Sequence, residues 1–210
     1  MIVSDLSAAA SELDLQLQER ALQQFEDYLE LLAKWNKVYN LTAIRESSKW
    51  VSHHLMDSLA VVRYLPTGSV IDVGSGAGLP GLPIAIACPS RQVCLLDSSH
   101  KKCAFLRQAA AELKLQNVSV ISSRVQAYRP AAAFDVVISR AFSELSEFVA
   151  CARHLCARGG RMLAMKGVFP DEEISQLPAA SVERVQKLRV PLLDAERHLV
   201  IVDADQLGAI

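Results

Sequence analysis

The chain has 210 residues, 51% of them hydrophobic, and its 22 Lys and Arg residues against 23 Asp and Glu residues leave a formal net charge of -1. This hydrophobic content and this low charge exclude both an intrinsically disordered chain and a polybasic protein that coats nucleic acid. The length is that of one domain, with or without a helical extension. A nucleic-acid partner would therefore have to be held by a local basic patch.

No segment of the sequence predicts insertion into a membrane or export. The most apolar stretch, residues 79–88, is about half as long as the roughly 20 residues that a membrane-spanning helix needs, and prolines interrupt it. The N-terminus has no basic segment followed by an apolar run. The five cysteines form no Cys-x-x-Cys pair, which favours reduced thiols. We therefore expect a cytoplasmic protein, and a monomer.

The first part of the chain has a helical pattern. Leu22, Phe25, Leu29 and Leu32 lie at spacings of three, four and three, which predicts an amphipathic helix over residues 19–38. A second helix is expected over residues 48–64. Residues 1–66 are thus predicted to form an N-terminal helical cap.

From residue 67 onward, short apolar runs alternate with helical stretches. The predicted strands cover residues 69–73, 92–96, 118–122, 134–139, 160–165, 182–190 and 199–202, and the predicted helices cover 101–113, 145–155 and 171–177. This alternation is typical of an α/β fold with a doubly wound, mostly parallel sheet. The last two strands are too close in sequence for a crossover helix, so an antiparallel strand is expected at the sheet edge. Residues 67–210 are expected to form this domain, and with the cap to make one structural unit.

The most informative segment is VIDVGSGAGLPG, residues 70–81, in which a predicted strand runs into closely spaced glycines. Gly74, Gly76 and Gly78 suit a sharp turn with a ligand lying against the backbone, beyond the end of the first strand. The third glycine comes one residue earlier than the dinucleotide fingerprint requires. The pattern is instead typical of proteins that bind a nucleoside methyl donor, which has no pyrophosphate. The alternative is a tight strand–helix turn without a ligand.

An acid at the end of the next strand strengthens the ligand-binding interpretation. Asp97 lies 19 residues after Gly78, where a carboxylate accepts hydrogen bonds from ribose hydroxyls. Its alternative role is to cap the following helix. After the third strand, a backbone amide of Val125 or Gln126 could bind an adenine ring nitrogen, and the Gln126 side chain could accept from the exocyclic amine. The alternative there is an exposed polar loop.

These motifs and others along the chain resemble the RsmG (GidB) family of bacterial small-subunit rRNA guanine-N7 methyltransferases. The matching segments are KWNKVYNLT (34–42), HHLMDSL (53–59), DVGSGAGLPGLPIAI (72–86), LLDSSHKKCAFLRQ (95–108), SRV (123–125), FDVVISRAF (134–142), KG (166–167) and VPLLDAERHLVI (190–201). They run nearly end to end. Gln126 departs from the family, which often has Glu after SRV.

The resemblance implies a Rossmann-like, class I S-adenosyl-L-methionine-dependent methyltransferase with a seven-stranded sheet and an N-terminal helical cap. It implies S-adenosyl-L-methionine as the cofactor, contacted by Gly74, Leu79, Val125, Gln126 and Arg140. It also implies 16S rRNA, in the small ribosomal subunit or an assembly intermediate, as the partner. The implied target is guanine 527 in the decoding-region loop.

Guanine N7 chemistry agrees with what the sequence lacks. N7 has an in-plane lone pair and no proton, so it can attack the methyl group in line without a general base, and catalysis reduces to alignment. A cytosine-C5 enzyme would want a cysteine at the end of the fourth strand, where Ser139 and Arg140 stand instead. The Asn/Asp-Pro-Pro-aromatic motif that is usual for exocyclic amines is also absent.

Basic residues at strand ends are the remaining candidates. Arg140 is the candidate catalytic residue, acting by positioning, since it could bind the donor carboxylate or the guanine O6 edge. Its alternative is an ion pair with an acid such as Glu144. Lys166, Arg197 and His198 are candidates for a phosphate-binding rim. For the last two, the alternative is a solvated strand entrance.

No metal site is expected. His54 and Asp57 share one helix face, but two ligands without a third make a poor site, and a polar contact to the main domain is the preferred role. Three other functions stay open. They are methylation of a small molecule or protein, a nicotinamide dehydrogenase of the same fold, and a non-catalytic nucleotide-binding module.

Overall fold

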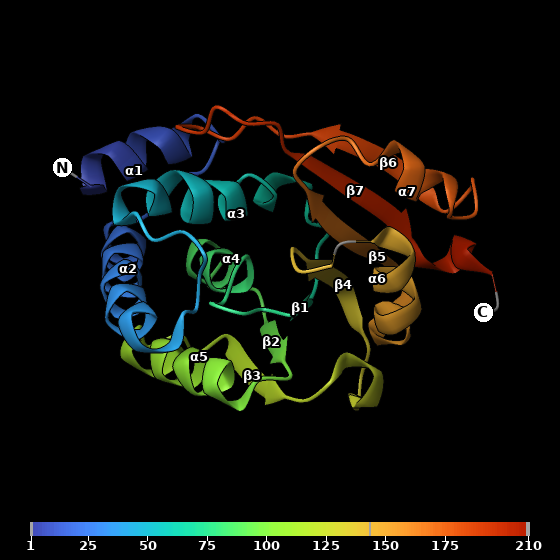
Figure 1. Ribbon diagram of the computed structural model, residues 1–210, viewed down its shortest axis with the longest axis horizontal. Coiled ribbons are helices and arrows are strands. Elements are labelled where there is room, and N and C mark those ends of the chain that lie inside the picture. The colour runs from blue at the N-terminus through green and yellow to red at the C-terminus, as the bar shows by residue number, and fades with distance from the viewer. Residues whose placement is uncertain (1, 143, 209–210) are drawn as a thin grey trace.

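A seven-stranded sheet forms the centre of the computed structural model, which describes residues 2–142 and 144–208 (Figure 1). The strands lie in the order β3-β2-β1-β4-β5-β7-β6. Their bounds are β1 Val70–Val73, β2 Val93–Asp97, β3 Val118–Ser122, β4 Phe134–Ser139, β5 Cys156–Lys166, β6 Val182–Lys187 and β7 His198–Asp203. β1 to β5 run parallel, whereas β7 is antiparallel to both β5 and β6. The antiparallel pairing therefore lies at the expected end of the sheet, with β7 one place in from the edge.

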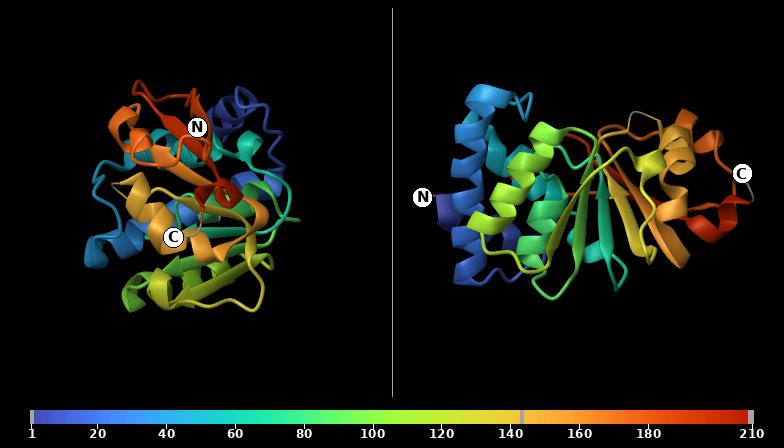
Figure 2. Two further views of the ribbon diagram at one scale, coloured as in Figure 1. Left: turned by 90° about the vertical axis from the view of Figure 1, so that its right-hand side faces the viewer. Right: turned by 90° about the horizontal axis from the view of Figure 1, so that it is seen from below.

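Helices cover both faces of this sheet (Figure 2). Their bounds are α1 Ile2–Ser11, α2 Glu19–Tyr39, α3 Asp57–Leu59, α4 Gly81–Ala87, α5 His100–Glu112, α6 Leu145–Ala152 and α7 Asp171–Ser175. Side chains of α1 to α5 join one hydrophobic cluster, and those of α6 and α7 join a second. α2 contacts α4 and α5 and lies outside them as a further layer.

Successive strand residues contribute to opposite faces of the sheet. In β1, Val70 belongs to the first cluster, and Ile71 and Val73 belong to the second. This is the alternation that a strand period of two requires. Asp72 is therefore directed towards the α4 face, where it is fully buried. The same alternation sets Val136 and Val137 of β4 on opposite faces.

The first cluster contains residues from before and after position 66. Leu6, Phe25 and Tyr28 of the helices belong to it together with Leu95 and Ile138 of the sheet. We propose that the helical cap (1–66) and the α/β domain (67–210) form one structural unit, because their apolar side chains share one core.

The segment expected as a single helix over residues 48–64 is irregular, and this part of the prediction is wrong. It consists of a 3-10 turn (η1, Ser47–Lys49), a π-helical turn (η2, Val51–Met56), α3 and a second 3-10 turn (η3, Val62–Tyr64). The Asp57 N–H bonds to the carbonyls of His54 and Ser52 rather than continuing one regular ladder. π-helical turns inside helices are frequent at functional sites.

Two helices are absent from the sequence prediction, and some predicted strands and helices begin or end at other residues in the structure. α1 and α4 were not predicted, the strand expected over residues 182–190 ends at Lys187, and β5 begins earlier than expected, at Cys156. Helix 145–155 becomes α6 followed by a 3-10 turn, η5 (Arg153–Leu155). Further 3-10 turns are η4 (Val125–Ala127) and η6 (Ala204–Leu207). No helix in the described part of the chain is long and apolar enough to cross a membrane. All five cysteines are free thiols.

Candidate active site

The glycine loop, residues 74–80, is anchored to the end of β2. The Gly74 and Ser75 N–H groups both donate to the Leu96 carbonyl, at 2.8 and 3.1 Å. The φ angles of Gly74, Gly76 and Gly78 are 73°, 58° and 87°, a region that glycine adopts far more readily than other residues. The loop conformation therefore accounts for all three glycines predicted from the motif.

Two of these glycines also allow close packing, in different directions. A Cβ atom at Gly74 would lie 2.9 Å from the Cβ of Ala141, which follows β4. A Cβ at Gly78 would clash with the buried Leu82. At Gly76 the nearest atom would be 3.8 Å away. Gly74 and Gly76 therefore face the cavities described below, whereas Gly78 packs against the core.

The side chain of Asp72, in β1, lies at the N-terminus of α4. Its Oδ2 accepts the Gly81 N–H at 2.9 Å, and its other oxygen is buried without a partner among the described residues. Burial raises the pKa of Asp72 to about 7, although its hydrogen bonds and the Arg140 charge act in the opposite direction. A dinucleotide pyrophosphate would need the helix N-terminus that this carboxyl group already fills. The geometry therefore argues against a nicotinamide cofactor.

Asp97 lines a cavity of about 430 Å³, here named cavity B to distinguish it from the neighbouring cavity A described below. Its Oδ2 accepts the Gly76 N–H at 2.9 Å and its Oδ1 accepts the Ser99 N–H at 2.8 Å. Ser99, rather than Asp97, caps α5, because its hydroxyl accepts the Lys102 N–H. Each carboxylate oxygen can accept a second hydrogen bond, so Asp97 retains acceptor capacity for a ligand.

Val125 and Gln126 line the other side of cavity B, in the 3-10 turn η4 after β3. The Gln126 side chain is exposed and its amide donates to Cys151 Sγ at 3.1 Å. The structure thus brings three of the predicted cofactor-binding residues, Asp97, Val125 and Gln126, to one cavity. The Gln126 amide nitrogen is already engaged by α6.

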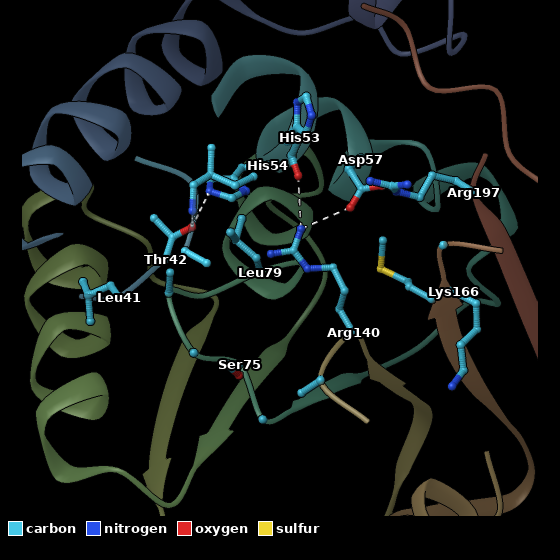
Figure 3. Close-up of a pocket in the computed structure, with 18 residues that line it drawn as sticks. Leu41, Thr42, His53, His54, Asp57, Ser75, Leu79, Arg140, Lys166 and Arg197 are labelled. Atoms are coloured by element: carbon cyan, nitrogen blue, oxygen red, sulfur yellow. Dashed lines mark hydrogen bonds and ion pairs between the residues drawn. The ribbon is translucent and has the colours of Figure 1, made fainter. Parts of the chain in front are cut away.

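A second cavity of about 520 Å³, cavity A, lies beside the first and shares Gly74 and Ala141 with it. It is lined by the glycine loop, by residues 41–44, by η2 and α3, and by the residues at the ends of β4, β5 and β7 (Figure 3). Leu79, Arg140, Lys166 and Arg197 from the sequence prediction all line it. Together the two cavities have the size of a small-molecule site.

Arg140 points from the end of β4 into cavity A, towards η2 and α3 (Figure 3). Its Nη1 lies 3.1 Å from Asp57 Oδ2 and 3.3 Å from the His53 carbonyl. The partner is therefore Asp57 rather than the expected alternative, Glu144. Arg197 Nε donates to the other Asp57 oxygen at 2.8 Å. Among the described residues, the structure gives Arg140 Nε and Nη2 no partner.

Lys166 and His198 are less accessible than a phosphate-binding rim requires. Lys166 Nζ binds Glu173 Oε2 at 2.6 Å and the Phe142 carbonyl at 3.3 Å. His198 is buried, lies outside both cavities and packs edge-on against the exposed ring of Phe169, with 5.5 Å between centroids. The structure therefore groups Arg197 with Arg140 and separates His198 from them.

His54 does not form a metal site with Asp57. Its Nε2 lies 2.9 Å from Thr42 Oγ1, which ties residues 41–44 to η2 (Figure 3). Burial lowers the pKa of His54 to about 4, so the ring is neutral near pH 7. No cluster of three His, Cys, Asp or Glu side chains suited to a metal exists in residues 2–142 and 144–208.

The polar contact predicted between Asp57 and the main domain is present, because Asp57 binds Arg140 and Arg197, although the sequence did not indicate these partners. Two features of the site were missed from the sequence: Asp72 and residues 41–44 were not singled out as site residues. Ser52, His54 and Asp57 are polar residues in a segment that is otherwise buried and apolar. That pattern was the available signal for a buried polar contact.

The strand order and the position of the cavities at the carboxyl edge of the sheet define the class I methyltransferase fold. Solved structures agree. A SAM dependent methyltransferase from Aquifex aeolicus has a TM-score of 0.57 at 18% identity, over 81% of this chain and 96% of that one. P. horikoshii TYW2, solved in complex with MeSAdo, has a TM-score of 0.55 at 13% identity, over 70% of this chain and 61% of that one.

Sequence comparison then identifies the family. The family model described as rRNA small subunit methyltransferase G matches residues 21–200. The protein named ribosomal RNA small subunit methyltransferase G from Chromobacterium violaceum is 54% identical, over 94% of this chain and 95% of its own. Its namesake from Laribacter hongkongensis is 51% identical, over 93% and 95%. The chain belongs to the rRNA small subunit methyltransferase G family, and the resemblance seen in the sequence is confirmed.

Proposed function

We propose that this protein transfers the methyl group of S-adenosyl-L-methionine to N7 of a guanine in the 16S rRNA of the small ribosomal subunit. The family resemblance assigns that guanine to position 527. One observation carries the proposal. Cavity B, with its acid at the end of β2, and cavity A, with Arg140, meet at Gly74 and Ala141. A donor in one cavity can therefore reach an acceptor in the other.

The residues around cavity B suit the donor. S-adenosyl-L-methionine supplies an electrophilic methyl group on a sulfonium centre. Asp97 would accept hydrogen bonds from the ribose hydroxyls, and the backbone of Val125 and Gln126 would bind the adenine. Gly74 and Gly76 would let the amino-acid part lie against the loop, since neither has a side chain in the way. The names of the structural neighbours support this choice of donor.

Arg140 is the residue that we place next to the reacting atoms. Its Nε and Nη2, which have no partner in the described part of the chain, can bind the donor carboxylate or the guanine O6 edge, the two roles that the sequence left open. Two buried polar side chains of cavity A are already engaged. Asp57 is bound by two arginines, and His54, held by Thr42, has a pKa that burial lowers, which makes it a weak base. Such a site suits N7, whose lone pair needs no general base.

A second candidate, methylation of a small molecule or a protein, is favoured by the charges in cavity A. An unpaired positive patch around Arg140, Lys166 and Arg197 would have argued against it. Instead, Asp57 and Glu173 bind all three cations. The family name supports RNA, and an assay that offers both kinds of acceptor decides between them.

The test is methyl transfer from labelled S-adenosyl-L-methionine to 30S subunits, with 50S subunits as the control. The 30S subunits come from bacterial cells that lack the enzyme, so that the target is unmodified. We expect label in 16S rRNA and none in ribosomal proteins or 50S subunits. Label in a protein would support the second candidate. No transfer together with measurable donor binding would contradict the proposed function.

A further inference from the structure

Asp57 joins three separate parts of the chain at cavity A. It belongs to the first turn of α3, Arg140 follows β4, and Arg197 immediately precedes β7. The Asp57 side chain is 3% exposed, whereas those of Arg140 and Arg197 are 28% and 24% exposed. Each of its oxygens binds a different guanidinium, at 3.1 and 2.8 Å. A buried carboxylate thus lies behind two cations that both line the cavity.

The carboxylate determines where these cations stand. Without the Asp57 carboxylate, the guanidinium groups of Arg140 and Arg197 would repel each other. In a partly buried site that repulsion is stronger than in water. The His53 carbonyl adds a second acceptor to Arg140 Nη1, at 3.3 Å, which fixes the plane of the guanidinium group. Two of the Arg140 nitrogens are thereby left for a substrate group.

We infer that Asp57 is a positioning residue, whose negative charge holds Arg140 and Arg197 in the orientation that methyl transfer requires. The inference rests on the proposed function for its catalytic part. Asp57 does not touch the substrate and acts through Arg140. The N-terminal helices are therefore part of the catalytic apparatus, since they supply this carboxylate.

A second ion pair between the same regions provides a matched control. Glu12, just after α1, binds Arg189 at 2.8 Å, in the connection between β6 and β7. This pair also joins the N-terminal helices to the end of the chain, but it is exposed and lies outside cavity A. Glu12→Gln removes a carboxylate–arginine contact of the same kind without affecting Arg140. If the N-terminal helices merely need to be attached to the rest of the chain, substitutions of Glu12 and of Asp57 should both lower activity. If Asp57 positions the arginines, only its substitution should do so.

The experiment compares wild type with Asp57→Asn, Asp57→Glu and Glu12→Gln. For each protein, kcat and KM for 30S subunits are measured at several salt concentrations. We expect Asp57→Asn to lower kcat by about 10-fold or more, because misplaced groups lose alignment. We also expect its KM to depend more steeply on salt, because two cations lose their counter-charge. Asp57→Glu keeps the charge and should recover part of kcat, and Glu12→Gln should stay within about 2-fold of wild type.

A spectroscopic readout tests the contact without any activity. The Arg197 Nε–H that donates to Asp57 should give a protected ¹H–¹⁵N signal in the wild type and in Asp57→Glu. In Asp57→Asn one of the two arginines faces an NH2 group instead of an oxygen, and the negative charge is gone, so the signal should shift or be lost. A signal unchanged from wild type, or a changed signal with unchanged kcat, would overturn the inference. If Asp57→Asn does not fold, Asp57→Ser, which also removes the charge, serves instead, and an unchanged kcat in it would overturn the inference.

The outcome also separates this inference from the proposed function. A wild-type protein that fails to methylate 30S subunits contradicts the proposed function and, with it, the catalytic part of the role of Asp57. The Arg197 signal would still decide whether Asp57 holds the two arginines.

Discussion

Gly74 combines a conformational requirement with a close contact, and the two can be separated by experiment. Its φ of 73° is almost the same as the 74° of Gly159, but only at Gly74 would a Cβ meet a neighbour, Ala141. We predict that Gly159→Ala lowers the free energy of unfolding by about 1–2 kcal/mol, the cost of a left-handed conformation for alanine, and that Gly74→Ala lowers it by more, because its Cβ would also lie too close to Ala141. Only Gly74→Ala should also lose affinity for S-adenosyl-L-methionine. Calorimetric titration and urea unfolding measure the two effects, and equal donor affinities in the two variants would contradict the prediction.

Arg140 provides a second prediction at the residue scale. Arg140→Ala should lower kcat/KM for 30S subunits by about 100-fold, the size of effect seen when a preorganised donor is removed from a site. Arg140→Lys keeps the charge and loses the planar guanidinium group, so its kcat/KM should lie between those of wild type and Arg140→Ala. A raised donor Kd would assign Arg140 to the donor carboxylate, and an unchanged Kd would assign it to the guanine. Near-wild-type activity in Arg140→Ala would contradict any catalytic role.

His54 should make stability depend on pH. Its pKa is lowered by burial to about 4 in the folded chain, from an ordinary value of 6.5. The unfolded chain therefore binds more protons than the folded chain between these values, and the stability contributed by neutral His54 is lost as the pH falls. The free energy of unfolding of wild type relative to His54→Gln should decrease by about 3 kcal/mol from pH 7 to pH 4. The difference between the two proteins cancels other titrating groups, and a pH-independent difference would contradict the prediction.

The positions of Asp97 and Arg140 beside the cavities could be predicted, because each stands at the end of a recognisable strand. For Asp57, a polar contact with the main domain could be predicted, but its two arginine partners could not. Asp57 lies 83 residues from Arg140 and 140 residues from Arg197, so only the folded topology brings them together. The position of His198 at the start of a strand suggested an exposed rim, but β7 lies between β5 and β6, and His198 is buried there.

At the scale of elements, α2 supports the glycine loop from behind. The buried Tyr28 hydroxyl of α2 donates to the Ala77 carbonyl at 2.8 Å. Burial raises the pKa of Tyr28 well above its usual value, so the hydroxyl keeps its proton. We predict that Tyr28→Phe lowers the free energy of unfolding by about 1–2 kcal/mol, because the carbonyl loses its partner. Tyr39→Phe, at the exposed end of α2, serves as the control and should change the free energy of unfolding by less than about 0.5 kcal/mol. Equal effects would contradict the prediction.

The strands were predicted better than the helices, for a physical reason. Central parallel strands are buried on both sides and appear as continuous apolar runs, as in β1 and β2. α4 was missed because Pro80 and Pro83 suggested a break, although both lie where a helix begins and proline is tolerated there. The π-helical turn η2 leaves little trace in the apolar period, because its polar residues Ser52 and His54 face inward.

At the scale of the whole molecule, the formal charge of -1 gives little general attraction for RNA. In the proposed function, recognition then depends on local groups, and the proposed place for them is the carboxyl edge of the sheet. There the paired cations of cavity A limit the attraction further. The cap and the α/β domain contribute to the same cavity, since residues 41–44 and Asp57 line it together with the strand ends.

The most direct test of the central claim is to identify the methylated atom. The purified protein is given S-adenosyl-L-methionine and unmodified 30S subunits, and the 16S rRNA is then mapped by a chemical cleavage specific for N7-methylguanosine. We predict one N7-methylguanosine, at guanine 527, whose amount falls in Arg140→Ala. Methylation of another atom or another nucleotide, or a modified base that is equally abundant in Arg140→Ala, would contradict the claim.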